Sequence, residues 1–363
     1  MDRRAFLTLL VVAAGCGPAE TPNKASASQE KTSADSATAA THDKPTTGLN
    51  APGSRMPRVA TLVYGSRVTG SASTTAIGVS PIQLFRDRLR DLGYIEGKTI
   101  AIEERYADGD PQRLEALATR IVAADPDVIV AIAAASTAAA RRATATIPIV
   151  MVHAGDPVGA GWAASLAKPG GNVTGSTSQV PELGSKQVEL LRELVPHLSR
   201  LGVLANPTNA GTPLALANVA AAARRFDIGI TLAEVTRAED FDAALRTLAG
   251  ARLDALFVMI EPMIFLNRVR LLEFAARNRI PASYDVGRET VREGGLISFG
   301  PLLSTHYALA ADYVDKILKG AKPGDLPIQQ PTQFALVVNL KTAKSLGLTV
   351  PPSVLTRADE VIQ

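Results

Sequence analysis

The chain has 363 residues, of which 46% are hydrophobic and 4% aromatic, so it is long and apolar enough for two ordinary domains with hydrophobic cores. Its 38 Lys and Arg residues nearly balance 35 Asp and Glu residues, and the net charge of +3 is not clustered, which argues against a nucleic-acid-binding protein. The single cysteine, Cys16, excludes an internal disulfide framework, a Cys-ligated zinc site and a CxxC redox pair.

The N-terminus has the pattern of an export signal. Arg3 and Arg4 precede an apolar run at residues 5–15, which is too short for a transmembrane helix. The small residues just before Cys16 resemble the lipobox of bacterial lipoproteins, which implies that residues 1–15 are a signal peptide and that Cys16 is lipidated. A plain secretory signal with an incidental cysteine is the alternative, and the paired arginines also resemble a twin-arginine signal.

The segment that follows has the composition of a tether. Residues 17–56 contain no aromatic residue, no Val and no Ile. Such a segment cannot bury enough apolar surface to offset the entropy of ordering. We expect residues 16–56 to form a disordered linker between Cys16 and the folded part of the chain.

From residue 57 onward, short β-branched runs alternate with amphipathic stretches, a pattern typical of βαβ units on a parallel sheet. The expected strands lie at residues 58–64, 99–103, 128–132, 149–153, 173–176, 201–205, 228–235, 255–259, 282–284 and 296–299. Helices are expected at residues 81–92, 111–124, 136–143 and around 160–167. Phe85 and Leu89 mark the buried face of the first helix, and Gly93 ends it as a C-cap.

The two halves of this region carry the marks of a duplication. Asp127 recurs as Asp254 and Pro148 as Pro281, each at the start of an expected strand, and the Gly-Gly pair at residues 170–171 recurs at residues 294–295. The pattern predicts an α/β fold of two Rossmann-like parallel-sheet lobes around a central cleft. A ligand would bind outside the carboxyl ends of the strands that line it.

Catalytic and metal-binding motifs are missing from the sequence. It contains no HExxH, GxSxG or GxxxxGK[ST] motif and no EF-hand loop. His153 and Asp156 are the one conceivable acid–base pair, although a strand-end histidine bonded to the backbone is the simpler interpretation. We therefore expect a protein that is not an enzyme and that holds no metal and no cofactor.

Polar residues follow the expected strands of the first half. Ser136 and Thr137 open a helix after the strand at residues 128–132, where free amides and hydroxyls suit a carboxylate, although Ser136 also fits as an N-cap alone. Gly155 and Asp156 follow the next strand, where Asp156 either accepts from an ammonium group or caps a turn. The end of the first strand is followed by the candidate ligand residues Tyr64 and Ser66.

The second half places four further candidates at equivalent strand ends, namely Asn206, Glu261, Tyr284 and Asp285. Tyr284 beside Asp285 suits a ligand with an amine and an apolar body. The alternatives are that Tyr284 packs in the core and that Asp285 caps a helix.

The sequence resembles a known family over nearly all of residues 57–363. The matching segments lie at residues 85–97, 147–150, 155–175, 190–196, 339–352 and 357–362. They resemble bacterial ABC-transporter substrate-binding proteins of the tryptophan/tyrosine type, which have the type I periplasmic-binding fold. The resemblance implies a first lobe of residues 57–177 plus about 301–325 and a second lobe of residues 178–300 plus about 326–363.

The same resemblance implies a small amino-acid-like or aromatic or carboxylate solute, an ABC permease with its ATPase subunit as partners, and no nucleic acid. It also implies a monomer held by its lipid anchor to a bacterial membrane, in the periplasm or at the cell surface. Among the candidate residues, the family's pattern transfers best to Ser136, Thr137, Gly155 and Asp156. The alternative function is a ligand-sensing receptor that signals to a membrane partner.

Overall fold

The computed structural model describes residues 55–67, 81–178, 180 and 183–363, and the expected signal peptide, Cys16 and all but the last two residues of the expected tether lie outside them. Arg55, which we assigned to the tether, is described, and its guanidinium lies 3.0 Å from the Asp127 carboxylate. Among the described residues, no helix is long and apolar enough to cross a membrane.

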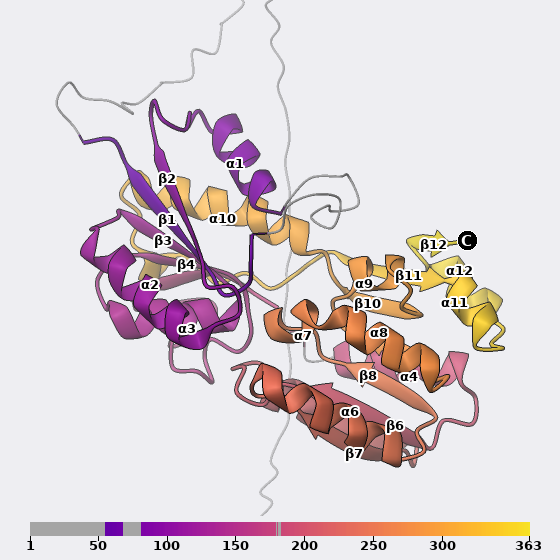
Figure 1. Cartoon of the computed structure of the whole chain (residues 1–363). Helices are drawn as coiled ribbons and strands as arrows, with labels where there is room; N and C mark the ends of the chain where they lie inside the picture. The colour runs from indigo at the N-terminus through magenta and orange to yellow at the C-terminus, as the bar shows by residue number, and fades with distance from the viewer. Residues whose placement is uncertain (1–54, 68–80, 179, 181–182) are drawn as a thin grey trace, which may run out of the picture. The chain divides into compact units, whose positions relative to one another are not determined.

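The first sheet has five strands in the order β2-β1-β3-β4-β5, and all of their pairings are parallel. The strands are β1 (Arg58–Val63), β2 (Ala101–Tyr106), β3 (Val128–Ile132), β4 (Ile149–Ala154) and β5 (Val173–Thr177). Helices α2 (Pro111–Ala123) and α3 (Ala133–Ala143) pack on one face, against alternate residues such as Leu62 and Ile129. The other face packs against α1 (Pro81–Asp91) and α10 (Leu303–Leu318), which lie side by side (Figure 1).

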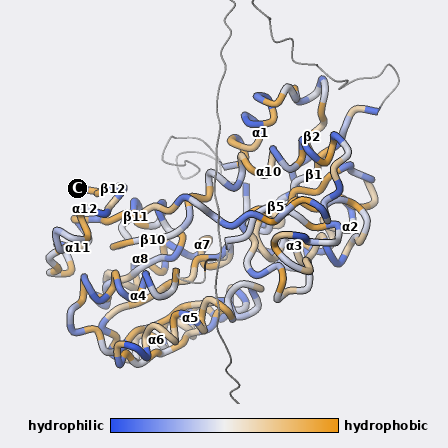
Figure 2. Tube along the Cα trace, turned by 180° about the vertical axis from the view of Figure 1, so that it is seen from behind, coloured by the Kyte–Doolittle hydropathy of each residue, from blue (hydrophilic) through white to orange (hydrophobic). Residues whose placement is uncertain are grey.

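The second sheet has seven strands in the order β12-β11-β10-β9-β8-β6-β7. They are β6 (Arg200–Ala205), β7 (Gly229–Glu234), β8 (Ala255–Val258), β9 (Ala282–Tyr284), β10 (Ile297–Pro301), β11 (Phe334–Asn339) and β12 (Glu360–Ile362). The helices are α4 (Leu183–Leu194), α5 (Thr212–Arg225), α6 (Phe241–Gly250), α7 (Pro262–Leu266), α8 (Arg268–Arg277), α9 (Arg288–Arg292), α11 (Leu340–Ser345) and α12 (Pro352–Arg357), with short 3-10 turns at Ala238–Asp240 and Pro323–Asp325. Hydrophobic and hydrophilic residues alternate along the covering helices (Figure 2), as amphipathic packing on a sheet requires.

Strands β6 to β10 repeat the order of β1 to β5, and equivalent hydrogen bonds support the repeat. The Asp127 carboxylate accepts from the Arg58 amide at the start of β1, and the Asp254 carboxylate accepts from the Arg200 amide at the start of β6. The α/β class with two Rossmann-like sheets is therefore confirmed. One departure is β11, which pairs antiparallel with β10 and extends the second sheet beyond the repeat.

Two expected helices need correction. Residues 160–167 form turns and bends, because Gly159 and Gly161 favour a turn and the Trp162 amide donates back to the Pro157 carbonyl. Helix α3 begins at Ala133 rather than at residue 136, with Ile132 at its N-cap position. Ser136 therefore lies inside the first turn and does not cap the helix.

Candidate functional site

The carboxyl ends of β1, β6 and β8 bring three candidate residues together. The Tyr64 hydroxyl donates to the Gly109 carbonyl over 2.7 Å, and burial together with the nearby charge of Glu261 raises the pKa of Tyr64. Glu261 caps α7, because its Oε1 accepts from the Ile264 amide over 2.8 Å. Asn206 also bonds to the Glu261 side chain, and burial raises the pKa of that carboxyl. Residues from both sheets thus meet at this point.

Asp285 follows β9 and belongs to the same group. Its Oδ1 accepts from the Ile260 amide over 2.6 Å and from the Val286 amide over 2.7 Å. Because Ile260 directly precedes Glu261, the two acidic residues flank one stretch of backbone. Burial raises the pKa of Asp285 to about 7, and no described Lys, Arg or His forms an ion pair with it. An ammonium group would supply the positive charge that this carboxyl lacks.

Gly155 and Asp156 follow β4, and their side-chain chemistry is local. The Asp156 Oδ1 accepts from the Gly159 amide over 2.8 Å, which is the turn alternative of the sequence analysis. Gly155 lies directly against Gly211, which precedes α5 in the second sheet. The Thr177 hydroxyl at the end of β5 donates to the Ala154 carbonyl over 2.9 Å and holds this loop in place.

Ser136 and Thr137 are fully buried in α3. The Thr137 hydroxyl donates to the Ala133 carbonyl over 3.0 Å, and the Ser136 Oγ has no hydrogen-bond partner among the residues that the structure describes. The strained residue of this segment is Ala133, which has φ +68 at the junction of β3 and α3. A left-handed alanine costs about 1–2 kcal/mol, and such strain is typical of functional junctions.

The two remaining candidates lie apart from this group. Tyr284 is fully buried, and its hydroxyl has no hydrogen-bond partner within the described part of the chain. Its side chain borders a cavity of about 240 Å³ between α8 and the turn at Gly294. Ser66 is half-buried just after β1. Of the ten candidate ligand residues, the structure brings four together, namely Tyr64, Asn206, Glu261 and Asp285.

His153 does not pair with Asp156. Its ring lies against His306 and Tyr307 at the start of α10, with ring centroids 6.3 Å and 6.2 Å away. Burial lowers the pKa of His153 to about 3 and that of His306 to about 4. Neutral, buried imidazoles without a carboxylate partner are poor general bases at neutral pH. Among the described residues, no group of three or more His, Cys, Asp or Glu could hold a metal ion.

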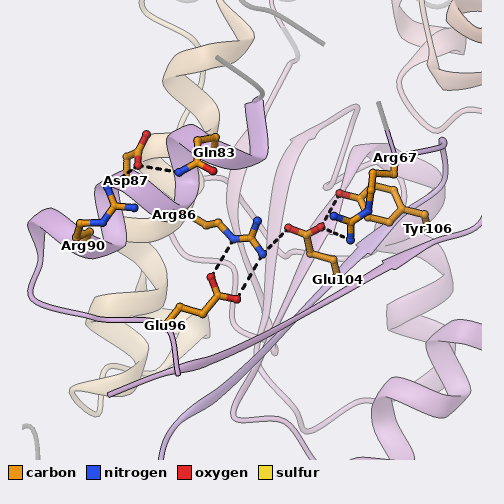
Figure 3. Close-up of polar contacts among 8 residues, drawn as sticks. All are labelled: Arg67, Gln83, Arg86, Asp87, Arg90, Glu96, Glu104 and Tyr106. Atoms are coloured by element: carbon orange, nitrogen blue, oxygen red, sulfur yellow. Dashed lines mark hydrogen bonds and ion pairs between the residues drawn. The ribbon is translucent and has the colours of Figure 1, made fainter. Parts of the chain in front are cut away.

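A cavity of about 660 Å³ lies between β2 and α2 and is lined by four arginines, Arg67, Arg105, Arg113 and Arg120. Most of this charge is neutralised locally. Figure 3 shows Glu104, whose side chain is 3% exposed, between Arg67 and Arg86, at 2.7 Å and 2.9 Å. Arg113 is likewise paired with Asp108. Most of the arginines that line the cavity therefore already have acidic partners. The group of Tyr64, Asn206, Glu261 and Asp285 instead combines aromatic, amide and acidic side chains.

The comparison with known families decides the assignment. The family described as ABC transporter substrate binding protein matches residues 80–362. The chain belongs to this family.

The chain is also similar to individual proteins, in sequence and in fold. A tyrosine-binding protein of Clostridioides difficile is 28% identical over 265 residues, which cover 73% of this chain and 75% of that protein. The structure of an ABC domain from Streptococcus pneumoniae in complex with L-Trp is 26% identical with a TM-score of 0.77, and a conserved domain protein from Vibrio cholerae is 29% identical with a TM-score of 0.76. Both comparisons cover 85% of this chain and 100% of the other.

Sequence reasoning missed several residues of this region. Gly211 has no motif around it that marks a contact with a distant loop. His306 lies within a helix, and its place beside His153 depends on a long-range connection. The buried Glu104 lies in a strand in which three of six residues are charged, a pattern that predicts an exposed edge strand and not a buried ion pair.

Proposed function

We propose that this substrate-binding protein takes an L-amino acid with an aromatic or other apolar side chain and delivers it to an ABC permease and its ATPase. Asp285 would accept from the ammonium group, with Glu261 and Asn206 beside it. Tyr64 would contact the apolar body of the solute. The observation that carries the proposal is the carboxyl of the half-buried Asp285, which accepts from two backbone amides and has no cationic partner among the described residues.

The first-sheet side of the site supplies the carboxylate partner in this proposal. The carboxyl end of β3 and the first backbone amides of α3, which lie beside Ser136 and Thr137, would face the carboxylate of the solute. Gly155 and Asp156 would border it with Ser66, and Tyr284 would support the site through packing. The L-Trp-bound and tyrosine-binding relatives support an amino acid as the class of solute.

We infer that the chain is exported, lipidated on Cys16 and held at the periplasmic or outer face of a bacterial membrane as a monomer without enzymatic activity. Its two lobes, at residues 57–177 with about 301–325 and at residues 178–300 with about 326–363, would close on the solute. The family match supports an importer component over a signalling receptor.

A thermal-shift screen tests the solute class. At a concentration about 100 times its Kd, a solute stabilises the folded state by about 2.7 kcal/mol, which raises the Tm by several degrees. We expect this rise with L-tryptophan or L-tyrosine and no rise with the D-enantiomers or with hexoses. A rise with a hexose and with none of the L-amino acids would refute the proposed solute.

A further inference from the structure

The loops after β4 and before α5 meet at two glycines, one from each side of the site. A β carbon added at Gly155 would lie 2.5 Å from the Gly211 Cα, and one added at Gly211 would lie 2.8 Å from the Gly155 Cα. Real Cβ atoms essentially never come within 3.0 Å of another heavy atom of this kind. The neighbour in each case is backbone, which cannot rotate away as a flexible side chain can.

The backbone conformation does not explain these glycines. Gly211 has φ −82 and ψ −18, which any L-residue adopts. Gly155 is not among the glycines with positive φ. The absence of a side chain is therefore required by the contact between the two loops and not by the local fold of either loop.

The contact is connected to the candidate site by hydrogen bonds. The Gly211 amide donates to the Asn209 side chain over 3.2 Å, and the Asn209 amide donates to the Asn206 carbonyl over 3.2 Å. The Asn206 side chain in turn bonds to Glu261, whose charge acts on Tyr64 of the first sheet. The position of the loop at residues 206–211 thus determines where Asn206 lies relative to the other site residues.

A second contact lies at the other end of the first sheet. A β carbon at Gly109, which follows β2, would lie 3.0 Å from the Leu266 Cδ1 of α7. In the first sheet, β1 and β3 lie between β2 and β4. The contact after β2 and the contact after β4 therefore lie on either side of Tyr64, which follows β1, and of Ala133, which follows β3. The glycine pair is the tighter of the two, because it joins backbone to backbone.

We propose that Gly155 and Gly211 are positioning residues that set how closely the two lobes approach, and that this close approach raises the affinity for solute. This inference rests on the proposed function for its affinity readout. A methyl group at either position would hold the two loops apart, so that Asn206 and Glu261 no longer reach their closed positions beside Tyr64. Because a solute held by both lobes dissociates when they separate, the effect should fall mainly on the dissociation rate.

The experiment compares Gly155→Ala and Gly211→Ala with Gly250→Ala. Gly250 ends α6, has no atom within 4 Å of an added β carbon and lacks a positive φ, so it controls for the general effect of replacing a glycine with alanine. We expect each of the first two variants to bind L-tryptophan or L-tyrosine at least tenfold more weakly by titration calorimetry, mainly through faster dissociation, and Gly250→Ala to bind like the parent. Affinities of Gly155→Ala and Gly211→Ala within twofold of the parent would overturn the inference.

A distance measurement separates this inference from the proposed function. In a chain whose Cys16 is replaced by serine, spin labels on cysteines at Arg90 and Arg237, whose side chains are 64% and 73% exposed, report the separation of the two lobes. Because the glycine contact joins backbone to backbone, we expect the parent to show a short-distance population that Gly155→Ala lacks. Identical distance distributions in parent and variant overturn the inference, even if the parent binds no amino acid and the proposed solute fails.

Discussion

Replacing Asp285 with Asn is expected to weaken the binding of an L-amino acid about 100-fold at pH 7.5, because a charge-assisted hydrogen bond in a buried site contributes about 3 kcal/mol. The Asp285 carboxyl accepts from the Ile260 and Val286 amides, which asparagine can still satisfy through its carbonyl oxygen. The variant should therefore fold normally and lose the charge that holds the ammonium group. Titration calorimetry with L-tryptophan and L-tyrosine measures this loss.

Asp359→Asn is the matched control. The Asp359 carboxylate also accepts from a backbone amide, that of Leu336, over 2.8 Å, but it lies between β11 and β12. We expect this variant to change the unfolding midpoint at most and to leave affinity unchanged. Equal affinities of Asp285→Asn and the parent would show that Asp285 does not hold the solute.

The same carboxyl makes binding depend on pH. Burial raises the pKa of Asp285 to about 7, and a bound ammonium group would lower it. Below pH 7 the protein must therefore release a proton to bind, so the affinity should fall as the pH is lowered from about 8 to about 6, by up to about tenfold per pH unit. Asp285→Asn should abolish this dependence in calorimetric titrations. A pH dependence that persists in the variant would assign it to another group.

The second large effect is loss of stability in acid through His153 and His306. Burial lowers their pKa values to about 3 and about 4, below the value of 6.5 for a free histidine. Between pH 6.5 and 4 the unfolded chain therefore binds protons that the folded chain does not, and the free energy of unfolding falls as the pH is lowered. Each histidine contributes about 1.4 kcal/mol per pH unit in this window. Urea unfolding at a series of pH values measures the slope.

His306→Phe is expected to remove one histidine's share of this slope. His306 is 2% exposed, and neither of its ring nitrogens has a hydrogen-bond partner among the described residues. Phenylalanine therefore loses no bond and removes an unsatisfied buried polar group, which costs about 1–3 kcal/mol. The variant should be more stable than the parent at pH 5. A parent-like slope in His306→Phe would place the acid sensitivity elsewhere.

The sequence predicts strands β1 to β10 to within three residues but not β11 and β12, because buried parallel strands are β-branched runs bounded by turn residues. Helix α3 is less predictable, since its first turn is Ala133 to Ser136 and alanine gives no sign of where a helix begins. The antiparallel strand β11 was missed because its partner β10 lies more than thirty residues earlier and α10 intervenes.

The sequence suggests candidate site residues for a similar reason. Strand ends of parallel sheets single out Tyr64 in the first sheet and Asn206, Glu261 and Asp285 in the second. Whether a given side chain points to that edge depends on local geometry, and Tyr284 instead faces the helices that cover its sheet. The glycine contact between Gly155 and Gly211 depends on how two distant loops meet, which no local pattern specifies.

A crystal structure of the protein grown with L-tryptophan or L-tyrosine tests the central claim most directly. We expect the ammonium group of the solute within hydrogen-bond distance of the Asp285 carboxylate, with Tyr64 and Asn206 in contact with the rest of the molecule. A solute found instead in the arginine-lined cavity between β2 and α2, with Asp285 still lacking a cationic partner, would contradict the account.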